Sequence, residues 1–274
     1  MKRNEVLIDE RASIHPKAEL DSEVEIGPFS VIGEDVKIGR GTRITANVFI
    51  TGKTEIGKNC YFSPFSSIGT EPQDLTYKNE ETLVKIGDNN IFREFITVHR
   101  GTVKGGGITK IGNNNYFMAY SHIAHDCSVG NETIFIHGAT IGGHVTVDDY
   151  ATVGAFSGVH QYCRIGKYAF IGGYSVITQD VLPFSRVAGS RPVLIFGLNV
   201  IGLRRRRFPR EKLQILKNVF KIIFWSELNT AQAIEKIKTE FEIIPEIEEI
   251  IKFIHTSKRG IIKKSAESWD IELV

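Results

Sequence analysis

The chain has 274 residues, of which 42% are hydrophobic and 24% charged, the composition of an ordinary globular protein with one large domain or two. The formal net charge is only +2, so we expect no nucleic-acid partner. No apolar run approaches the roughly 18 residues that span a membrane, and the first residues lack the apolar region of a signal peptide. These absences favour a cytoplasmic protein without a transmembrane segment.

From residue 8 onward, single large apolar residues recur at every sixth position. The ladder is unbroken over residues 8–68, returns over 86–98, and is unbroken again over 111–177. Neither a helix, with period 3.6, nor a strand, with period 2, gives this spacing. A glycine often follows the apolar residue and a small residue often stands four positions after it. The pattern predicts six-residue units that stack as a parallel β-helix, with three units in each coil.

The ladder breaks in two places. Residues 70–85 and 99–110 interrupt the six-residue period, and we interpret both segments as excursions from the coil. The second is rich in glycine and is expected to be a flexible loop. Loops that leave a rigid scaffold often carry binding residues, so both excursions are candidate parts of a site.

Beyond the ladder the pattern changes twice. Residues 182–203, with several glycines and prolines, are expected to be irregular. From Pro209 the apolar period becomes 3.6, which predicts three helices. The last two are expected over 230–242 and 245–257, with Asn229 as the N-cap of the earlier one. We therefore expect a β-helix domain over 1–190 and a helical domain over 191–274, ending in a loose segment from residue 265.

The three cysteines all stand at the small position of a six-residue unit. Cys127 and Cys163 are 36 residues apart, two coils of the predicted helix. At about 4.8 Å per coil their separation exceeds the roughly 7 Å that a disulfide allows between Cα atoms. We expect Cys60, Cys127 and Cys163 to be reduced packing residues.

Histidines gather on one edge of the predicted prism. Because one coil takes 18 residues, His125, Gly143 and Gln161 form one column, and Asp126 and His144 belong to the next. His122 and His160 lie in the same stretch of coils. One interpretation is decoration: these histidines are simply polar surface residues on a corner of the prism, as a non-catalytic scaffold would have.

Two catalytic interpretations compete with decoration. Three histidines from stacked coils could hold zinc with an open position for water, as in a zinc hydratase of the gamma-carbonic-anhydrase type. Alternatively, a neutral histidine could accept a hydroxyl proton while a backbone N–H one coil away holds an oxyanion. The second arrangement suits acyl transfer, and it needs no metal or other cofactor.

Several runs closely resemble one enzyme family. They are His122-Ile123-Ala124-His125-Asp126-Cys127, Ile141-Gly142-Gly143-His144, Val159-His160-Gln161 and Gly202-Leu203-Arg204-Arg205-Arg206. The chain resembles, over nearly its whole length, the UDP-N-acetylglucosamine O-acyltransferases of bacterial lipid A biosynthesis. The resemblance implies an all-β left-handed parallel β-helix with a C-terminal helical domain, assembled as a homotrimer. It also implies transfer of a 3-hydroxyacyl chain from acyl carrier protein to the 3-position of the sugar in UDP-N-acetylglucosamine.

The resemblance also implies roles for individual residues. His125 would be the general base, Asp126 would orient and charge-stabilise it, and the Gly143 N–H would hold the oxyanion. The remaining implied residues would bind substrate: Gln73, Asp74, His122, His144, His160 and Gln161 at the sugar and pantetheine, Gly173 at the end of the acyl groove, and Asn199, Arg205 and Arg206 at the nucleotide. The chain departs from the family in having Thr76 in place of the usual lysine, Ile201 in place of a glutamate and Arg207 in place of a glycine.

Overall fold

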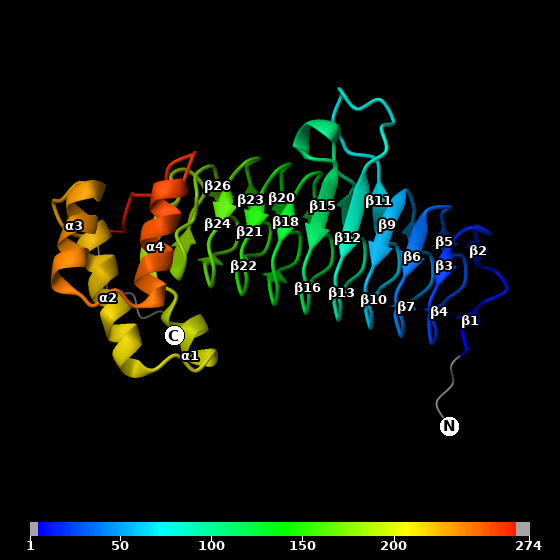
Figure 1. Cartoon of the computed structure of the whole chain (residues 1–274), viewed down its shortest axis with the longest axis horizontal. Coiled ribbons are helices and arrows are strands. Elements are labelled where there is room, and N and C mark those ends of the chain that lie inside the picture. The colour runs from blue at the N-terminus through cyan, green and yellow to red at the C-terminus, as the bar shows by residue number, and fades with distance from the viewer. Residues whose placement is uncertain (1–4, 267–274) are drawn as a thin grey trace.

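The computed structural model describes residues 5–266 as an elongated three-sided prism of short strands with four helices at its C-terminal end (Figure 1). Through most of the prism each strand pairs in parallel with the strand three places later in the chain, so three strands make one coil. This is the parallel β-helix that the six-residue period predicts, and its left-handed winding is the one implied by the family resemblance.

The strands stack into three sheets, one for each side of the prism, which we call sheets A, B and C. Sheet A contains β1 (Leu7–Ile8), β4 (Glu25–Ile26), β7 (Arg43–Ile44), β10 (Tyr61–Phe62), β13 (Ile91–Phe92), β16 (Tyr116–Phe117), β19 (Ile134–Phe135), β22 (Thr152–Val153), β25 (Phe170–Ile171), β27 (Ser185–Ala188) and β28 (Leu194–Leu198). Sheet B contains β2 (Ser13–Ile14), β5 (Val31–Ile32), β8 (Phe49–Ile50), β11 (Ser67–Thr70), β14 (Thr97–His99), β17 (His122–Ile123), β20 (Thr140–Ile141), β23 (Gly158–Val159) and β26 (Val176–Ile177). Sheet C contains β3 (Glu19–Leu20), β6 (Val36–Ile38), β9 (Lys53–Ile56), β12 (Leu83–Ile86), β15 (Ile108–Ile111), β18 (Ser128–Val129), β21 (Thr146–Val147) and β24 (Arg164–Ile165).

The apolar ladder forms the core of the prism. Ladder residues pair with one another in register, as Ile26 does with Ile44, and every one from Ile26 to Ile177 is buried. The rings of Phe62, Phe92 and Phe117 stack in adjacent coils with centroids 4.7 and 4.8 Å apart. At the N-terminal end, by contrast, Ile8 is 46% exposed because it lies in the first coil.

The two breaks in the ladder are places where the chain leaves the prism. Ile56 pairs with Ile86, 30 residues later instead of 18, so 12 extra residues form the first excursion, between β11 and β12. Ile86 pairs with Ile111, 25 residues later, so seven extra residues form the second excursion, between β14 and β15. Both project from the same side of the prism (Figure 1). The second contains the short 3-10 helix η1 (Val103–Gly105).

The expectation that residues 182–203 are irregular is wrong. Strand β27 pairs in parallel with β25 and extends sheet A, and β28 pairs antiparallel with β27. Helix α1 (Val200–Arg205) follows directly, capped by Asn199. Of the glycine and proline residues that suggested irregularity, Gly189 and Pro192 lie in the connection between the two strands, whereas Gly197 belongs to β28 and Gly202 to α1. The proposed domain boundary after residue 190 falls in that connection, and it stays a prediction.

Three further helices follow, close to their predicted bounds: α2 (Arg210–Phe224), α3 (Thr230–Glu240) and α4 (Pro245–Thr256). The Asn229 side chain accepts a hydrogen bond from the Gln232 N–H, and the Gln232 side chain accepts one from the Asn229 N–H, so the predicted cap is a complete capping box. Ser265 bridges to Ile195 and Ala266 is buried, so these two residues are not loose as expected. Residues 267–274 lie outside the described residues.

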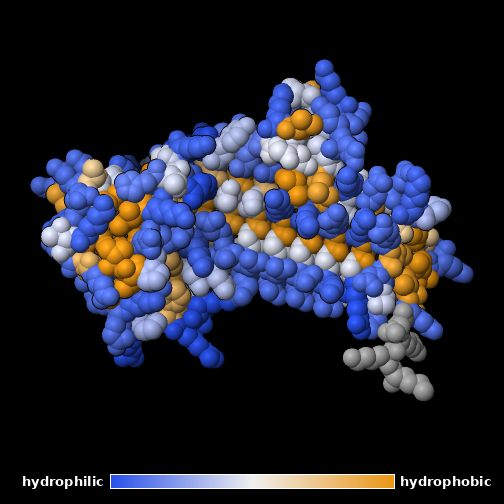
Figure 2. All heavy atoms as spheres, viewed as in Figure 1, coloured by the Kyte–Doolittle hydropathy of each residue, from blue (hydrophilic) through white to orange (hydrophobic). Residues whose placement is uncertain are grey.

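Two further predictions from the sequence concern membrane-spanning segments and the cysteines. Within residues 5–266 no helix is long and apolar enough to cross a membrane. Figure 2 shows apolar residues in a band along the prism, between mainly hydrophilic margins. Cys60, Cys127 and Cys163 are buried free thiols, as predicted. Burial raises the pKa of Cys60 to about 11 and that of Cys127 to about 12, so neither thiol is a nucleophile near neutral pH.

Candidate active site

His125 lies on the corner where sheet B turns into sheet C, between β17 and β18. Its Nδ1 atom is 2.8 Å from Oδ2 of Asp126. The His125 side chain is 13% exposed and the Asp126 side chain is fully buried. The pairing leaves Nε2 of His125 available to a substrate, which is the geometry that a general base requires.

Asp126 is held by residues that the sequence did not single out. Its Oδ1 accepts the backbone N–H of Thr102 at 2.8 Å, and its Oδ2 accepts the Thr102 hydroxyl at 2.6 Å. The Asp126 N–H donates to Oγ1 of Thr109 at 2.8 Å. Thr102 belongs to the second excursion, so this segment fixes the carboxylate that orients His125. The only sequence signal was a threonine inside the glycine-rich interruption.

Gly143 lies one coil beyond His125, as the 18-residue column predicts. A Cβ atom added to Gly143 would stand 2.5 Å from Cε1 and 2.8 Å from Nε2 of His125, so only glycine leaves room for the imidazole. Among the residues that the structure describes, the Gly143 N–H has no hydrogen-bond acceptor, whereas the Gly143 carbonyl accepts from the Tyr162 N–H at 3.1 Å. An available N–H beside a base can hold an oxyanion.

His144 faces the same acid from the next coil. Its Nε2 atom is 3.8 Å from Oδ2 of Asp126, and its ring lies perpendicular to that of His125 with centroids 5.2 Å apart. The other face of the His144 ring stacks on Tyr162 at 4.3 Å. Burial lowers the pKa of His144, against the opposing effect of Asp126, which favours a neutral ring.

The left-handed backbone in this region belongs to the prism and not to the site. Asp126, His144 and Tyr162 have φ angles of 60°, 62° and 64°. The same conformation recurs at Phe29 and Asn47, in N-terminal coils far from the His125 corner. These positive φ angles are therefore the ordinary geometry of the corners, and no functional strain follows from them.

Two further histidines extend the cluster along sheet B. His122 hydrogen-bonds Oγ1 of Thr97 through Nδ1 at 2.7 Å, and its ring meets that of His99 edge to face at 4.8 Å. His99 was not among the predicted residues, although it begins the second excursion. It is 4% exposed, and burial lowers its pKa to about 4. Burial also lowers the pKa of His122.

Neutral His99 should make the fold less stable in acid. Its pKa is about 4 when folded and 6.5 in the unfolded reference state, so the unfolded chain binds the extra proton between these values. Stability is therefore complete above pH 6.5 and is lost as the pH falls towards 4, by up to about 3 kcal/mol. Replacing His99 with Phe, which does not titrate, should flatten the dependence of unfolding free energy on pH in this window, measured by denaturant titration at fixed protein concentration. If the unfolding free energy of the variant depends on pH as steeply as that of the parent, His99 is not the source of this dependence.

The predicted residues of the first excursion lie near the histidine corner. The pKa of Asp74 is lowered, first by backbone and side-chain hydrogen bonds from Thr76 and then by the nearby charges of His125 and Lys104. Asp74 also acts on the pKa of His144, so its carboxylate lies within electrostatic reach of both histidines. Gln73 precedes it and is exposed.

Three other predicted residues lie further along the prism. His160 and Gln161 are exposed on the same corner one coil beyond Gly143, with Nδ1 of His160 3.2 Å from the Gln161 carbonyl oxygen. Gly173 lies on a different corner, between β25 of sheet A and β26 of sheet B. A path from His125 to Gly173 therefore crosses the outer surface of sheet B.

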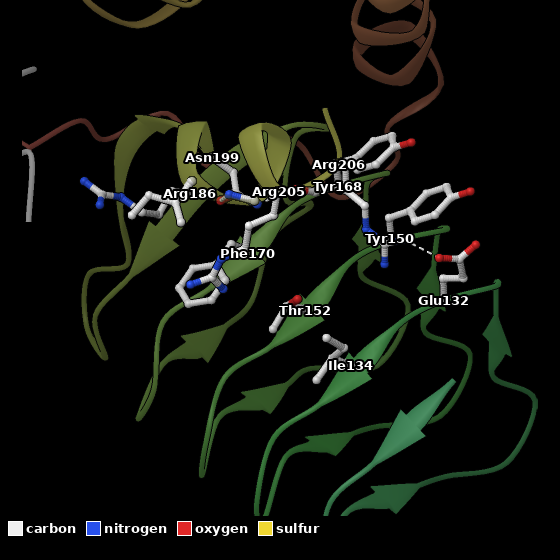
Figure 3. A pocket seen from close by; sticks show the side chains of 12 residues that line it. Glu132, Ile134, Tyr150, Thr152, Tyr168, Phe170, Arg186, Asn199, Arg205 and Arg206 are labelled. Atoms are coloured by element: carbon white, nitrogen blue, oxygen red, sulfur yellow. Dashed lines mark hydrogen bonds and ion pairs between the residues drawn. The ribbon is translucent and has the colours of Figure 1, made fainter. Parts of the chain in front are cut away.

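Asn199, Arg205 and Arg206 are not brought to the histidines. They border a separate pocket of about 370 Å³ over sheet A, whose floor comes from Ile134, Thr152 and Phe170 in successive coils (Figure 3). Arg206 is ion-paired with Glu132 and lies 4.6 Å above the Tyr150 ring. Within one chain, the predicted nucleotide residues and the predicted catalytic residues occupy different sides of the prism.

Within this pocket Asn199 already has structural partners. Its Oδ1 accepts the Gly202 N–H at 3.1 Å and caps α1, and its Nδ2 donates to the Tyr168 carbonyl oxygen at 2.9 Å. One departure from the resembled family lies in this pocket, and a second follows its last lining residue, Arg206, in the chain. Ile201 adds an apolar side chain to the pocket wall. Arg207 has φ 62°, a conformation that favours the glycine usual at this position.

The zinc interpretation can be tested against the same residues. One ligand atom each from His125, Asp126 and His144 lies within 4.8 Å of the others, so the cluster is compact enough for a metal. However, both oxygens of Asp126 already accept hydrogen bonds from Thr102, and Oδ2 is also bonded to His125. The cluster thus offers a metal two histidines and one carboxylate whose oxygens already accept hydrogen bonds. This donor set does not fit the three-histidine site of a zinc hydratase.

Family models match both parts of the chain. Residues 19–52 and 108–143 match the bacterial transferase hexapeptide model, and residues 180–262 match the second domain of UDP-N-acetylglucosamine O-acyltransferase. The chain is 52% identical over 256 residues to the acyl-[acyl-carrier-protein]–UDP-N-acetylglucosamine O-acyltransferase of Thermodesulfovibrio yellowstonii, covering 93% of this chain and 99% of the relative. It is 49% identical over 199 residues to the enzyme of the same name from Syntrophobacter fumaroxidans, covering 73% and 77%.

Solved structures agree with the sequence relatives. The UDP-N-acetylglucosamine acyltransferase of Francisella novicida superposes with a TM-score of 0.90 at 40% identity, covering 93% of this chain and 94% of that one. The Bacteroides fragilis enzyme gives a TM-score of 0.90 at 40% identity, covering 93% and 100%. The hexapeptide prism, the C-terminal helices and the histidine corner all occur in a chain that is similar to these enzymes over 93% of its length. The chain therefore belongs to the family of acyl-[acyl-carrier-protein]–UDP-N-acetylglucosamine O-acyltransferases.

Proposed function

We propose that this protein transfers a 3-hydroxyacyl chain from acyl carrier protein to the 3-position of UDP-N-acetylglucosamine in lipid A biosynthesis, with His125 as the general base. The observation that carries the catalytic assignment is the pairing of His125 with Asp126 on one side and with the available N–H of Gly143 on the other. Acyl transfer needs both a base for the attacking hydroxyl and a donor for the oxyanion.

The path of proton transfer follows from the hydrogen bonds of His125. When Nδ1–H of His125 donates to Asp126, Nε2 keeps its lone pair and accepts the proton of the sugar 3-hydroxyl. The hydroxyl oxygen attacks the thioester carbonyl, and the tetrahedral oxyanion accepts the Gly143 N–H. Collapse expels the pantetheine thiolate, which takes the proton back from Nε2. Asp126 stabilises the intermediate imidazolium charge.

Substrate contacts extend from this centre. In this proposal Gln73, Asp74, His122 and His144 bind the sugar, and His160 and Gln161 line the pantetheine surface. The acyl chain runs across sheet B and ends near Gly173, where an added Cβ would stand 3.3 Å from the Ala155 carbonyl oxygen. Arg205 and Arg206 bind the nucleotide, and Asn199 holds α1 in the position that presents both arginines.

A homotrimer would unite the two separated halves of this site. Aromatic rings form a column on the corner between sheets A and B, among them Phe65, which is 54% exposed, and Tyr174, which is 71% exposed. Rings in adjacent coils stack there, as Phe65 does on Phe95 at 5.0 Å. So much exposed aromatic surface is typical of an interface. If this corner lies on a threefold axis, sheet B of one copy packs against sheet A of the next.

That packing brings the His125 corner of one copy towards the Arg206 pocket of its neighbour. We expect light scattering to give three times the chain mass. Co-expression of His125→Ala and Arg206→Ala chains should restore activity at low sugar-nucleotide concentration, because about a quarter of the sites in randomly mixed trimers keep both intact halves. Mixed trimers without restored activity would contradict a site shared between chains.

The arginine run gives the acyl carrier protein a place to dock. Arg206 is engaged with Glu132, but Arg204, Arg210 and Lys217 border an open cavity between α1 and α2. Clustered cations favour an acidic partner and speed its association. We place the acyl carrier protein at this surface, which a cytoplasmic enzyme would present to a soluble donor.

The function is tested by mass spectrometry of the product. The purified protein is incubated with UDP-N-acetylglucosamine, or with its 3-amino analogue, and a panel of 3-hydroxyacyl carrier proteins. A product heavier by one hydroxyacyl group, labile to mild base when the acceptor is the hydroxyl sugar, is the expected result. Absence of product with every donor would reject the function. The panel also reveals the preferred chain length and whether an amine replaces the hydroxyl.

A further inference from the structure

The second excursion reaches towards two carboxylates near His125. On one side Thr102 donates its backbone N–H and its hydroxyl to Asp126. Two residues later the chain reaches the other way, and Nζ of Lys104 donates to Oγ1 of Thr76 at 2.9 Å. Thr76 belongs to the first excursion, and Figure 1 shows the two excursions side by side on one side of the prism.

Thr76 connects Lys104 to Asp74. Both the Thr76 N–H and the Thr76 hydroxyl lie 2.8 Å from Oδ1 of Asp74. The hydroxyl thus accepts from the Lys104 ammonium and donates to the Asp74 carboxylate. A hydroxyl that accepts from a cation becomes a better donor, so the two hydrogen bonds strengthen each other.

The turn that carries Lys104 is itself well fixed. The Thr102 hydroxyl accepts the Gly105 N–H at 3.2 Å and closes η1. A Cβ on Gly105 would stand 2.0 Å from Cγ of Asp126, so the turn packs directly against the buried carboxylate. Lys104 therefore extends from a rigid base towards a longer excursion.

We propose that Lys104 is a positioning residue of the acceptor site, and that its ammonium, acting through Thr76, holds Asp74 in place beside the His125 corner. The inference rests on the proposed function, in which Asp74 contacts the acceptor sugar. It assigns to η1 and its N-cap the placement of two acids with different tasks: Asp126 serves the chemistry and Asp74 serves binding. Loss of Lys104 should consequently weaken acceptor binding more than it slows turnover.

The test compares kcat and KM for UDP-N-acetylglucosamine at saturating acyl carrier protein. Lys104→Met should raise KM about three- to tenfold, the effect of one hydrogen bond to a charged group at an exposed site, with kcat changed less than about twofold. Lys104→Arg should recover most of the loss because it keeps a cation. Thr76→Val should reproduce the Lys104→Met effect, since it removes the connection while leaving the ammonium.

The double variant separates action through Thr76 from direct contact with substrate. Lys104→Met combined with Thr76→Val should raise KM no further than either single change, because both break the same chain of hydrogen bonds. Additive increases in KM, an unchanged KM in Lys104→Met, or a loss in kcat alone would overturn the inference. Lys110→Met, which removes an exposed lysine on β15, is the matched control and should behave like the parent. If the parent gives no product, it is the proposed function that fails and not the role of Lys104.

Discussion

Replacing His125 with Ala should lower kcat by about 10²–10⁴-fold, the contribution expected of a general base. At about 1.36 kcal/mol per factor of ten, this is roughly 3–5 kcal/mol of lost transition-state stabilisation. The variant should still fold and assemble, because His125 lies on a corner outside the buried ladder. Steady-state kinetics measure the loss in kcat, and light scattering checks that the variant still assembles.

His144→Ala is the matched comparison for the base. His144 lies 3.8 Å from Asp126, while His125 is at 2.8 Å and also lies next to Gly143. We therefore expect His144→Ala to raise KM for the sugar nucleotide and to lower kcat less than His125→Ala does. If His125→Ala kept more than about a tenth of the parental kcat, against the minimum loss of about 10²-fold for a base, the assignment would be wrong and His144 would become the candidate.

Replacing Gly143 with Ala should lower kcat by about 10²-fold without unfolding the protein. The new methyl group would stand 2.5 Å from Cε1 of His125, so the imidazole must move by about an ångström, and a displacement of that size can cost about 10²-fold in rate. The effect should fall on kcat, because base and oxyanion donor act in the transition state.

The control is the same substitution at another corner of sheet B. A Cβ on Gly33 would lie 3.2 Å from Thr51, which requires only a small adjustment, and Gly33 is four coils from the histidines, about 19 Å at roughly 4.8 Å per coil. Gly33→Ala should keep parental kcat. Equal losses in the two variants would point to a general disturbance of the prism, and full activity of Gly143→Ala would contradict the placement of the oxyanion.

The repeating part of the fold could be predicted because its cause is local. A large residue at every sixth position can be buried only inside stacked coils, and the ladder from Ile26 to Ile177 is buried as expected. The same arithmetic placed Gly143 beside His125 and Asp126 beside His144, since residues 18 apart must lie in adjacent coils. The cap at Asn229 was equally local, because a side chain and an N–H three residues on decide it.

What the sequence alone did not reveal depends on segments that break the period. The pairing of β27 with β25 and β28 was missed because non-periodic strands are specified by partners distant in the chain. Thr102, Lys104 and His99 were missed because the path of an excursion follows from where it packs and not from its own spacing.

The sequence by itself determined the prism, its core and the column that contains His125 and Gly143, because a strict repeat converts position in the chain directly into position in space. Only the tertiary structure decided how the two excursions meet over His125, and that the Arg206 pocket lies on another side of the prism. Both depend on contacts between residues far apart in sequence, whose hydrogen bonds and charges acquire partners only after the coils have stacked.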